Sequence, residues 1–121
     1  FERLNSDKIG LCYDPSHLVW QMIDPYENIF KFREKIFHVH AKDTHVDAQK
    51  LNLYGALQNS KWWQHRLPGL LDWNRIVDSL YQIGYDKSIC IEHEDPVWEG
   101  TEEKVKRGIL KTRDHVSQFF M

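Results

Sequence analysis

The chain has 121 residues, 41% of them hydrophobic and 28% charged, and 16 basic residues against 18 acidic ones give a formal net charge of -2. This near balance offers no electrostatic support for a nucleic-acid or membrane-surface partner. No apolar run approaches the roughly 18 residues that cross a bilayer, so we expect no membrane span. The length fits one domain, and an aromatic content of 13% excludes a disordered chain.

The two cysteines, Cys12 and Cys90, are too few for a disulfide scaffold, so we expect a reducing, cytoplasmic location. The sequence begins at Phe1 without an initiator Met, and residues 1–6 (FERLNS) are typical of the end of a helix. We therefore expect residues 1–121 to be one portion of a longer protein.

Strands and helices are predicted to alternate along the first part of the chain. The short apolar run 9–14 indicates a buried strand. A helix is predicted from Asp24 to about Lys35, because Asp24 can cap its first turn and Pro25 suits the first helical position. Residues 36–41 form the second predicted strand.

The second half continues the alternation after an irregular segment. Residues 44–71 are rich in Asn, Gln, Trp and His and are long for a loop, which indicates a functional segment or a short helix. A helix capped by Asp72 is predicted over 73–83, a third strand over 88–92, and a last helix over 101–120.

Strands that alternate with helices in this way predict an α/β protein with a parallel sheet, whose ligands collect at the carboxyl ends of the strands. Each helix should contribute apolar side chains to the core. The expected set is Tyr26, Ile29, Phe30, Phe32, Ile76, Val77, Leu80, Ile83, Val105, Ile109, Leu110, Val116, Phe119 and Phe120.

The two faces of each predicted strand differ. One face is apolar, for example Phe37, Val39 and Ala41, and the other is small or polar. The polar faces end in Asp14, in His40 and in Glu92, respectively. A barrel interior with a site at its carboxyl end has this pattern, whereas an open doubly wound sheet is more often apolar on both faces.

Asp14, His40 and Glu92 are therefore expected to converge. Two carboxylates and an imidazole without a thiolate suit Mn²⁺, Mg²⁺, Co²⁺ or Zn²⁺ as a catalytic rather than a structural ion. Each residue also has a simpler interpretation: Asp14 as a helix cap, His40 as a core histidine, Glu92 as part of a solvated charge run. One metal site replaces three separate explanations at three strand ends.

Other polar residues are weaker candidates. His17, three residues after Asp14, either bonds a substrate or occupies the first turn of a helix. Lys42 and Asp43 flank the expected mouth of the site, where Lys42 is a candidate substrate-binding residue, or form a plain surface pair. Arg66 either anchors an anionic group through bidentate hydrogen bonds or is a surface arginine.

His38 and the pair Trp62-Trp63 complete the candidates. His38 is one pleat below His40, which favours a buried structural histidine over a ligand. The two tryptophans form either a wall against which a sugar stacks or a small cluster under the long loop.

The ordered motifs resemble the C-terminal part of the xylose isomerase-like (β/α)₈ barrels, the sugar phosphate isomerases and epimerases. The resemblance covers nearly the whole chain and implies that it supplies strands six to eight of a TIM barrel. The matching segments are Asp14-Pro15-Ser16-His17, His38-Val39-His40-Ala41-Lys42-Asp43, Leu67-Pro68-Gly69, Asp72-Trp73, Gly84-Tyr85-Asp86 and Ile91-Glu92-His93-Glu94-Asp95.

The resemblance implies a divalent metal held by Glu, Asp, His and Glu from successive strands. It assigns the Asp, His and last Glu roles to Asp14, His40 and Glu92, and makes Glu92 an acid/base group. It also implies that His17 contacts substrate and that Arg66 lies near it, although the segment before the Pro-Gly turn is longer than in the epimerases. The first Glu would lie upstream of the sequence.

The implied function is a metal-dependent sugar or sugar phosphate isomerase or epimerase that works through a cis-enediolate. The alternatives are an inosose-type dehydratase on the same site, a phosphodiester-cleaving enzyme, which the net charge of -2 opposes, and a non-catalytic metal- or sugar-binding barrel. Unpaired strand edges predict that the isolated chain is inactive and forms a homo-oligomer or associates with the missing barrel portion.

Overall fold

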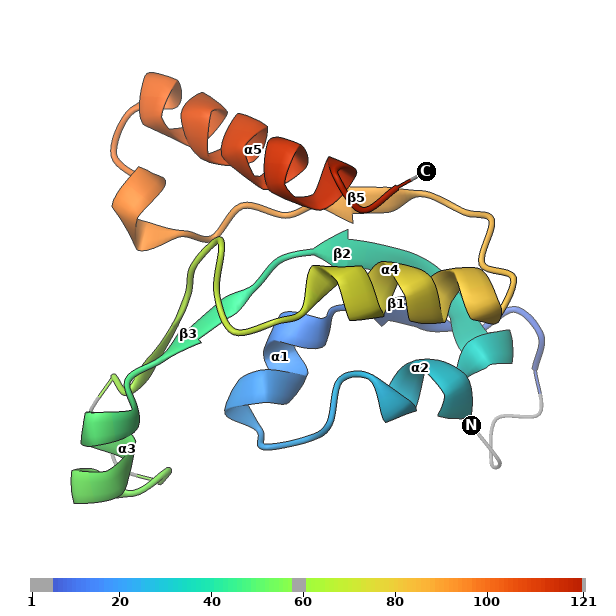
Figure 1. The fold of residues 1–121 in the computed structure, drawn as a ribbon, viewed down its shortest axis with the longest axis horizontal. Coiled ribbons are helices and arrows are strands. Elements are labelled where there is room, and N and C mark those ends of the chain that lie inside the picture. Colours follow the sequence, from blue (N-terminus) through green and yellow to red (C-terminus); the bar gives the residue numbers. More distant parts are fainter. Residues whose placement is uncertain (1–5, 58–60, 121) are drawn as a thin grey trace.

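The fold is built on a parallel three-stranded sheet, seen in a computed structural model that describes residues 6–57 and 61–120 (Figure 1). The strands are β1 (Leu11–Tyr13), β2 (Ile36–Ala41) and β5 (Ile89–Ile91), in the spatial order β1-β2-β5. Both pairings are parallel, as the alternation of elements predicted. The helix end predicted at 1–6 lies mostly outside the described residues.

Side-chain caps fix where the helices begin. Asp72 Oδ1 accepts a hydrogen bond from Arg75 N at 3.0 Å, and Thr101 Oγ1 accepts one from Lys104 N at 3.2 Å, so the predicted starts of two helices are confirmed. In the described ranges, every helix is too short or too polar to cross a membrane. The helices between and after the parallel strands are α1 (Pro15–Trp20), α2 (Glu27–Lys31), α4 (Trp73–Gln82) and α5 (Glu102–Ser117), with single 3₁₀ turns η1 (Arg33–Lys35) and η2 (Pro96–Trp98).

The single helix predicted from Asp24 to Lys35 is interrupted. Asp24 does organise its start, because Oδ1 accepts from Tyr26 N at 2.7 Å and from Glu27 N at 2.8 Å. However, the α-helix ends at Lys31 and continues only as the 3₁₀ turn η1.

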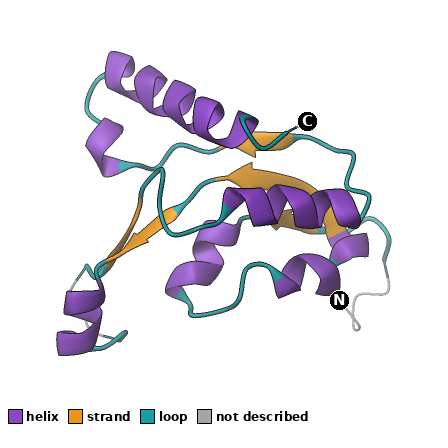
Figure 2. Ribbon diagram, in the orientation of Figure 1, coloured by secondary structure: helices purple, strands orange, loops and turns teal. Residues whose placement is uncertain are grey.

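The segment predicted as irregular contains regular structure. The strands β3 (Thr44–Val46) and β4 (Trp63–His65) pair antiparallel, and α3 (Ala48–Tyr54) lies between them. The predicted short helix is thus confirmed. Figure 2 shows that α3 and the far end of this hairpin extend away from the main sheet.

The core lies on the side of the sheet that packs against the helices. Ile29, Val39 and Ile76 are completely buried there, and Trp73 nearly so. Four predicted core residues are nevertheless exposed, by 38% to 48% of their surface, because they lie on the outward side of their helices or at the C-terminal end: Phe30, Ile109, Leu110 and Phe120. Phe37 is also 36% exposed and packs over Gly10, where any side chain would collide with its ring.

The buried face of helix α5 differs in part from the apolar stripe predicted for it. Its buried face is Gly108, Thr112 and Val116, spaced four residues apart. A Cβ at Gly108 would lie 2.7 Å from His93 Cε1 and 2.8 Å from Trp98 Cβ. The helix therefore approaches the segment after β5 too closely for a large side chain at this position.

Candidate metal centre

The three parallel strands bring the predicted ligands together at their carboxyl ends. Asp14 follows β1, His40 is near the end of β2, and Glu92 follows β5. Their candidate ligand atoms all lie within 4.8 Å of one another. His40 Nδ1 is 2.9 Å from Glu92 Oε2 and 3.6 Å from Asp14 Oδ2.

The two carboxylate oxygens of Asp14 have different surroundings. Oδ1 accepts hydrogen bonds from Ser16 N at 3.0 Å and from Ser16 Oγ at 2.6 Å, which caps α1 as the simpler interpretation predicted. Oδ2 is buried and has no hydrogen bond, although the Lys42 ammonium lies 3.0 Å away as an ion pair. The helix cap and the metal-ligand interpretation are therefore compatible.

Lys42 is buried at the centre of this cluster, so its interpretation as half of a surface pair is wrong. Its Nζ lies 2.6 Å from carboxylate oxygens of both Glu92 and Glu94, and 3.1 Å from His17 Nε2. Burial lowers the pKa of Lys42, but hydrogen bonds to Glu92 and Glu94, together with the negative charge of Asp14, outweigh this and raise it above its ordinary value. One ammonium among three carboxylates leaves a net charge of about -2, which a divalent cation would balance.

The adjacent residue, Asp43, is also buried, so its interpretation as half of a plain surface pair is wrong, although it lines the same small cavity as Lys42. Its Oδ1 accepts from Thr44 N at 2.6 Å and Leu71 N at 3.1 Å, and its Oδ2 from Gly69 N at 2.8 Å and Trp73 Nε1 at 3.3 Å. Burial raises the pKa of Asp43, and these hydrogen bonds offset part of that rise. Asp43 thus ties the loop before α4 to the end of β2.

A second polar group adjoins the first through His17. Candidate ligand atoms of His17, His65 and Glu94 lie within 4.8 Å of one another. Beside them the indole rings of Trp20 and Trp63 stack at 4.9 Å with an interplanar angle of 9°. Burial, and then the Lys42 charge, lower the pKa of His65.

His65 and Glu94 were not singled out from the sequence. The pairing of Thr44 with His65 in the β3–β4 hairpin carries His65 back to the end of β2. Only a predicted strand at 63–65 could have indicated this. Glu94, two residues beyond Glu92, looked like one member of a charge run.

Arg66 lies at the edge of the cluster and is engaged by Asp95. Its Nε is 3.0 Å from Asp95 Oδ1, and the same carboxylate accepts from Leu67 N at 3.1 Å and Val97 N at 2.9 Å. Arg66 and Lys42 line one small cavity together with Glu92 and Glu94. A substrate contact for Arg66 stays a prediction.

The residues at the strand ends fit a divalent metal. The buried Asp14 Oδ2 lacks a hydrogen bond, the His40 imidazole lies between two carboxylates, and the surrounding charge is negative. Oxygen and imidazole donors of this kind suit hard to intermediate ions. Asp14, His40 and Glu92 would hold such an ion.

Parallel strands with helical crossovers and polar residues at the carboxyl ends define an α/β protein, and the pattern is that of one part of a (β/α) barrel. The family model described as "Xylose isomerase-like TIM barrel" matches residues 1–115. The chain belongs to this family, which confirms the resemblance and the fold class expected from the sequence.

Relatives and a solved structure agree with this assignment. The chain is 30% identical over 96 residues to an inosose dehydratase of Lacticaseibacillus casei, 31% over 101 residues to an inosose dehydratase of Geobacillus thermodenitrificans (strain NG80-2), and 28% over 98 residues to the uncharacterized protein YfiH of Bacillus subtilis (strain 168). These alignments cover 72% to 78% of the chain but only 31% to 34% of the relatives. The chain thus spans about a third of their length.

The fold is shared with a xylose isomerase domain protein from Planctomyces limnophilus. The TM-score is 0.69 at 22% identity, and the alignment covers 97% of this chain and 42% of that one. The chain therefore matches a partial barrel.

Proposed function

We propose that this chain supplies the metal- and substrate-binding strand ends of a divalent-metal-dependent enzyme that moves a proton next to the carbonyl of a sugar or sugar phosphate. The observation that supports it is the convergence of Asp14, His40 and Glu92 around a buried carboxylate oxygen that lacks a hydrogen bond. When bound, a divalent cation polarises a carbonyl and acidifies the adjacent C–H bond.

The residues of the chain have separate roles in this proposal. Glu92 takes the proton, and the Lys42 ammonium, 2.6 Å from Oε2, fixes the position of that carboxylate. His17, on the other side of the ammonium, orients a substrate oxygen. Arg66, at the edge of the same cavity, binds an anionic group such as a phosphate.

Two reactions share this first step. Return of the proton to the other face or to the neighbouring carbon gives an epimerase or isomerase, the function implied by the sequence motifs. Loss of a hydroxyl group as water from the carbon next to the carbanion gives a dehydratase. The second reaction is supported by the two relatives named inosose dehydratase.

The full-length natural chain tests the proposal when it is incubated with a panel of ketoses, ketose phosphates and inososes in D₂O with Mn²⁺, Mg²⁺, Co²⁺ or Zn²⁺. Deuterium incorporation with conserved carbon skeleton and oxygen content indicates epimerase or isomerase activity, and loss of water indicates a dehydratase. Glu92→Gln should lower turnover by about 10²- to 10⁴-fold, whereas Glu99→Gln, a matched control beyond the site, should not.

A non-catalytic barrel makes a different prediction. Metal binding that depends on Asp14 and His40, without deuterium incorporation in any substrate of the panel, would favour a binding protein. Unchanged turnover in Glu92→Gln would show that the acid/base assignment is wrong.

A further inference from the structure

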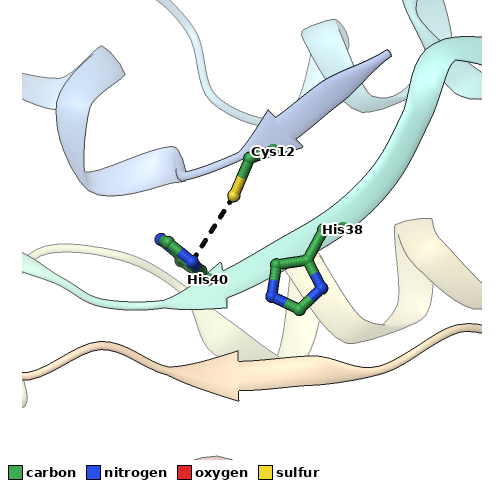
Figure 3. A group of neighbouring side chains, drawn as sticks. All are labelled: Cys12, His38 and His40. Atoms are coloured by element: carbon green, nitrogen blue, oxygen red, sulfur yellow. Dashed lines mark hydrogen bonds between the residues drawn. The ribbon is translucent and has the colours of Figure 1, made fainter. Parts of the chain in front are cut away.

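A second group of possible ligands lies below the candidate metal centre on the same face of the sheet. Cys12 in β1 and His40 in β2 point toward one another, and the His38 ring lies near them on the side of β2 away from β1 (Figure 3). Cys12 Sγ is 3.4 Å from His40 Nε2, and the His38 and His40 rings are 5.3 Å apart. Candidate ligand atoms of the three residues lie within 4.8 Å of one another.

His40 belongs to both groups through different ring nitrogens. Its Nδ1 faces Glu92 Oε2 at 2.9 Å, and its Nε2 faces the Cys12 thiol. The imidazole therefore separates a side with carboxylate donors from a side with sulfur and nitrogen donors.

We propose that Cys12, His38 and His40 form a binding site for a soft or borderline cation such as Zn²⁺, distinct from the oxygen-rich centre above it. A thiolate with two imidazoles is a donor set typical of zinc, and it leaves a fourth position for water. Ser88 Oγ lies 3.4 Å from His38 Nδ1 and can accept a hydrogen bond from it when the ion occupies His38 Nε2.

Occupancy of the lower site should weaken the upper one. A neutral imidazole has one lone pair, so a cation on His40 Nε2 leaves the ring proton on Nδ1, which then faces Glu92 and no longer ligates the upper cation. The coupling must be reciprocal, so Zn²⁺ bound by Cys12 should lower Mn²⁺ affinity by the same factor as Mn²⁺ lowers Zn²⁺ affinity.

Cobalt provides the direct test, because a Co²⁺–thiolate bond gives an intense near-ultraviolet charge-transfer band that oxygen and imidazole ligands do not give. The metal-free full-length natural chain should develop this band on titration with Co²⁺, and Zn²⁺ should abolish it. Cys12→Ser should lose the band, and His38→Gln should weaken binding about tenfold or more. Cys90→Ser tests the choice of thiol: Cys90 pairs with His40 across β2 and β5 but is not one of the three converging ligands, so its loss should leave the band intact, and a band lost in Cys90→Ser but kept in Cys12→Ser overturns the assignment.

Alkylation tests the wild-type chain, so its result does not depend on whether a variant folds correctly. Zn²⁺ should protect Cys12, identified by peptide mass spectrometry, from iodoacetamide and should leave Cys90 reactive. Equal alkylation of Cys12 with and without Zn²⁺, or a cobalt band that survives Cys12→Ser, overturns the inference.

The inference shares only His40 with the proposed function, so the two can fail separately. Mn²⁺ binding followed by electron paramagnetic resonance reports the upper centre, and the cobalt–thiolate band reports the lower one. Mn²⁺ binding without the band refutes the Cys12 site alone, and the band without Mn²⁺ binding refutes the upper centre alone.

Discussion

Substitution of Asp43 by Ala should be among the most destabilising changes in the chain. The carboxylate accepts four N–H groups, and three of their residues, Thr44, Leu71 and Trp73, are buried. Removing the acceptor leaves the two buried backbone donors, Thr44 N and Leu71 N, without a partner at about 1 to 3 kcal/mol each, so we expect a loss of about 4 kcal/mol or more in the free energy of unfolding. That is a large share of the roughly 5 to 15 kcal/mol that stabilises a domain.

Asp43→Asn separates the contributions of the two oxygens. An amide can keep its oxygen at the Oδ1 position for Thr44 N and Leu71 N, but its NH₂ group would then face the donors of Gly69 and Trp73. The expected loss is therefore intermediate, about 2 kcal/mol.

Urea unfolding followed by tryptophan fluorescence measures both variants, with Asp72→Ala as the matched control. Asp72 is also an acceptor at the start of α4, but its Oδ1 takes a single exposed donor, Arg75 N at 3.0 Å, and its loss should cost about 1 kcal/mol. If Asp43→Ala costs no more than Asp72→Ala, the reasoning from orphaned donors is refuted.

The remaining predictions concern four other features. Without divalent cations, Lys42→Met should lower the free energy of unfolding by about 3 kcal/mol, at the low end for a buried ion pair because Glu92 and Glu94 are partly exposed. Excess Mg²⁺ or Mn²⁺ should restore the lost stability. Lys50→Met, which removes an exposed ion pair, should change little in the same denaturation assay. The pKa of His65 is lowered from 6.5, so the unfolded state binds more protons and stability should fall as the pH drops below about 6.5. In unfolding curves measured between about pH 7 and 5, His65→Gln should flatten this dependence. The same pH dependence in His65→Gln and in the unsubstituted chain would contradict the prediction. Gly108→Ala should destabilise the protein by about 1 kcal/mol despite the better helix propensity of Ala, and a raised melting temperature would show that His93 and Trp98 move aside freely. The isolated 121-residue chain should self-associate in analytical ultracentrifugation through the outer edges of β1 and β5, and an active monomer would refute this.

The convergence of Asp14, His40 and Glu92 could be predicted because it depends only on two local rules. Side chains alternate across a strand, and parallel strands end at the same edge of the sheet. Neither rule requires knowledge of how the helices pack. The start of α4 was equally accessible, since an Asp cap acts within its own turn.

What the sequence did not reveal depends on contacts between distant segments. Lys42 is buried because Glu92 and Glu94, fifty or more residues later, return to it. The exposure of Phe30 and the choice of Gly108 for the buried face of α5 depend on how closely elements approach each other, which no local pattern encodes. His65 reaches the site only through the pairing of β3 with β4.

The alternation along β2 also limits how this gene can change in length. His38, His40 and Lys42 carry the polar chemistry, while Val39, Ala41 and Asp43 between them hold the core and the loop before α4. Deleting or inserting one residue in this stretch would exchange the two sets. Val39 would then face the candidate ligands, and the imidazoles would face the helices that pack against the sheet. Insertions and deletions tolerated during evolution should therefore fall outside β2, for example between α3 and β4, where extra residues displace neither set.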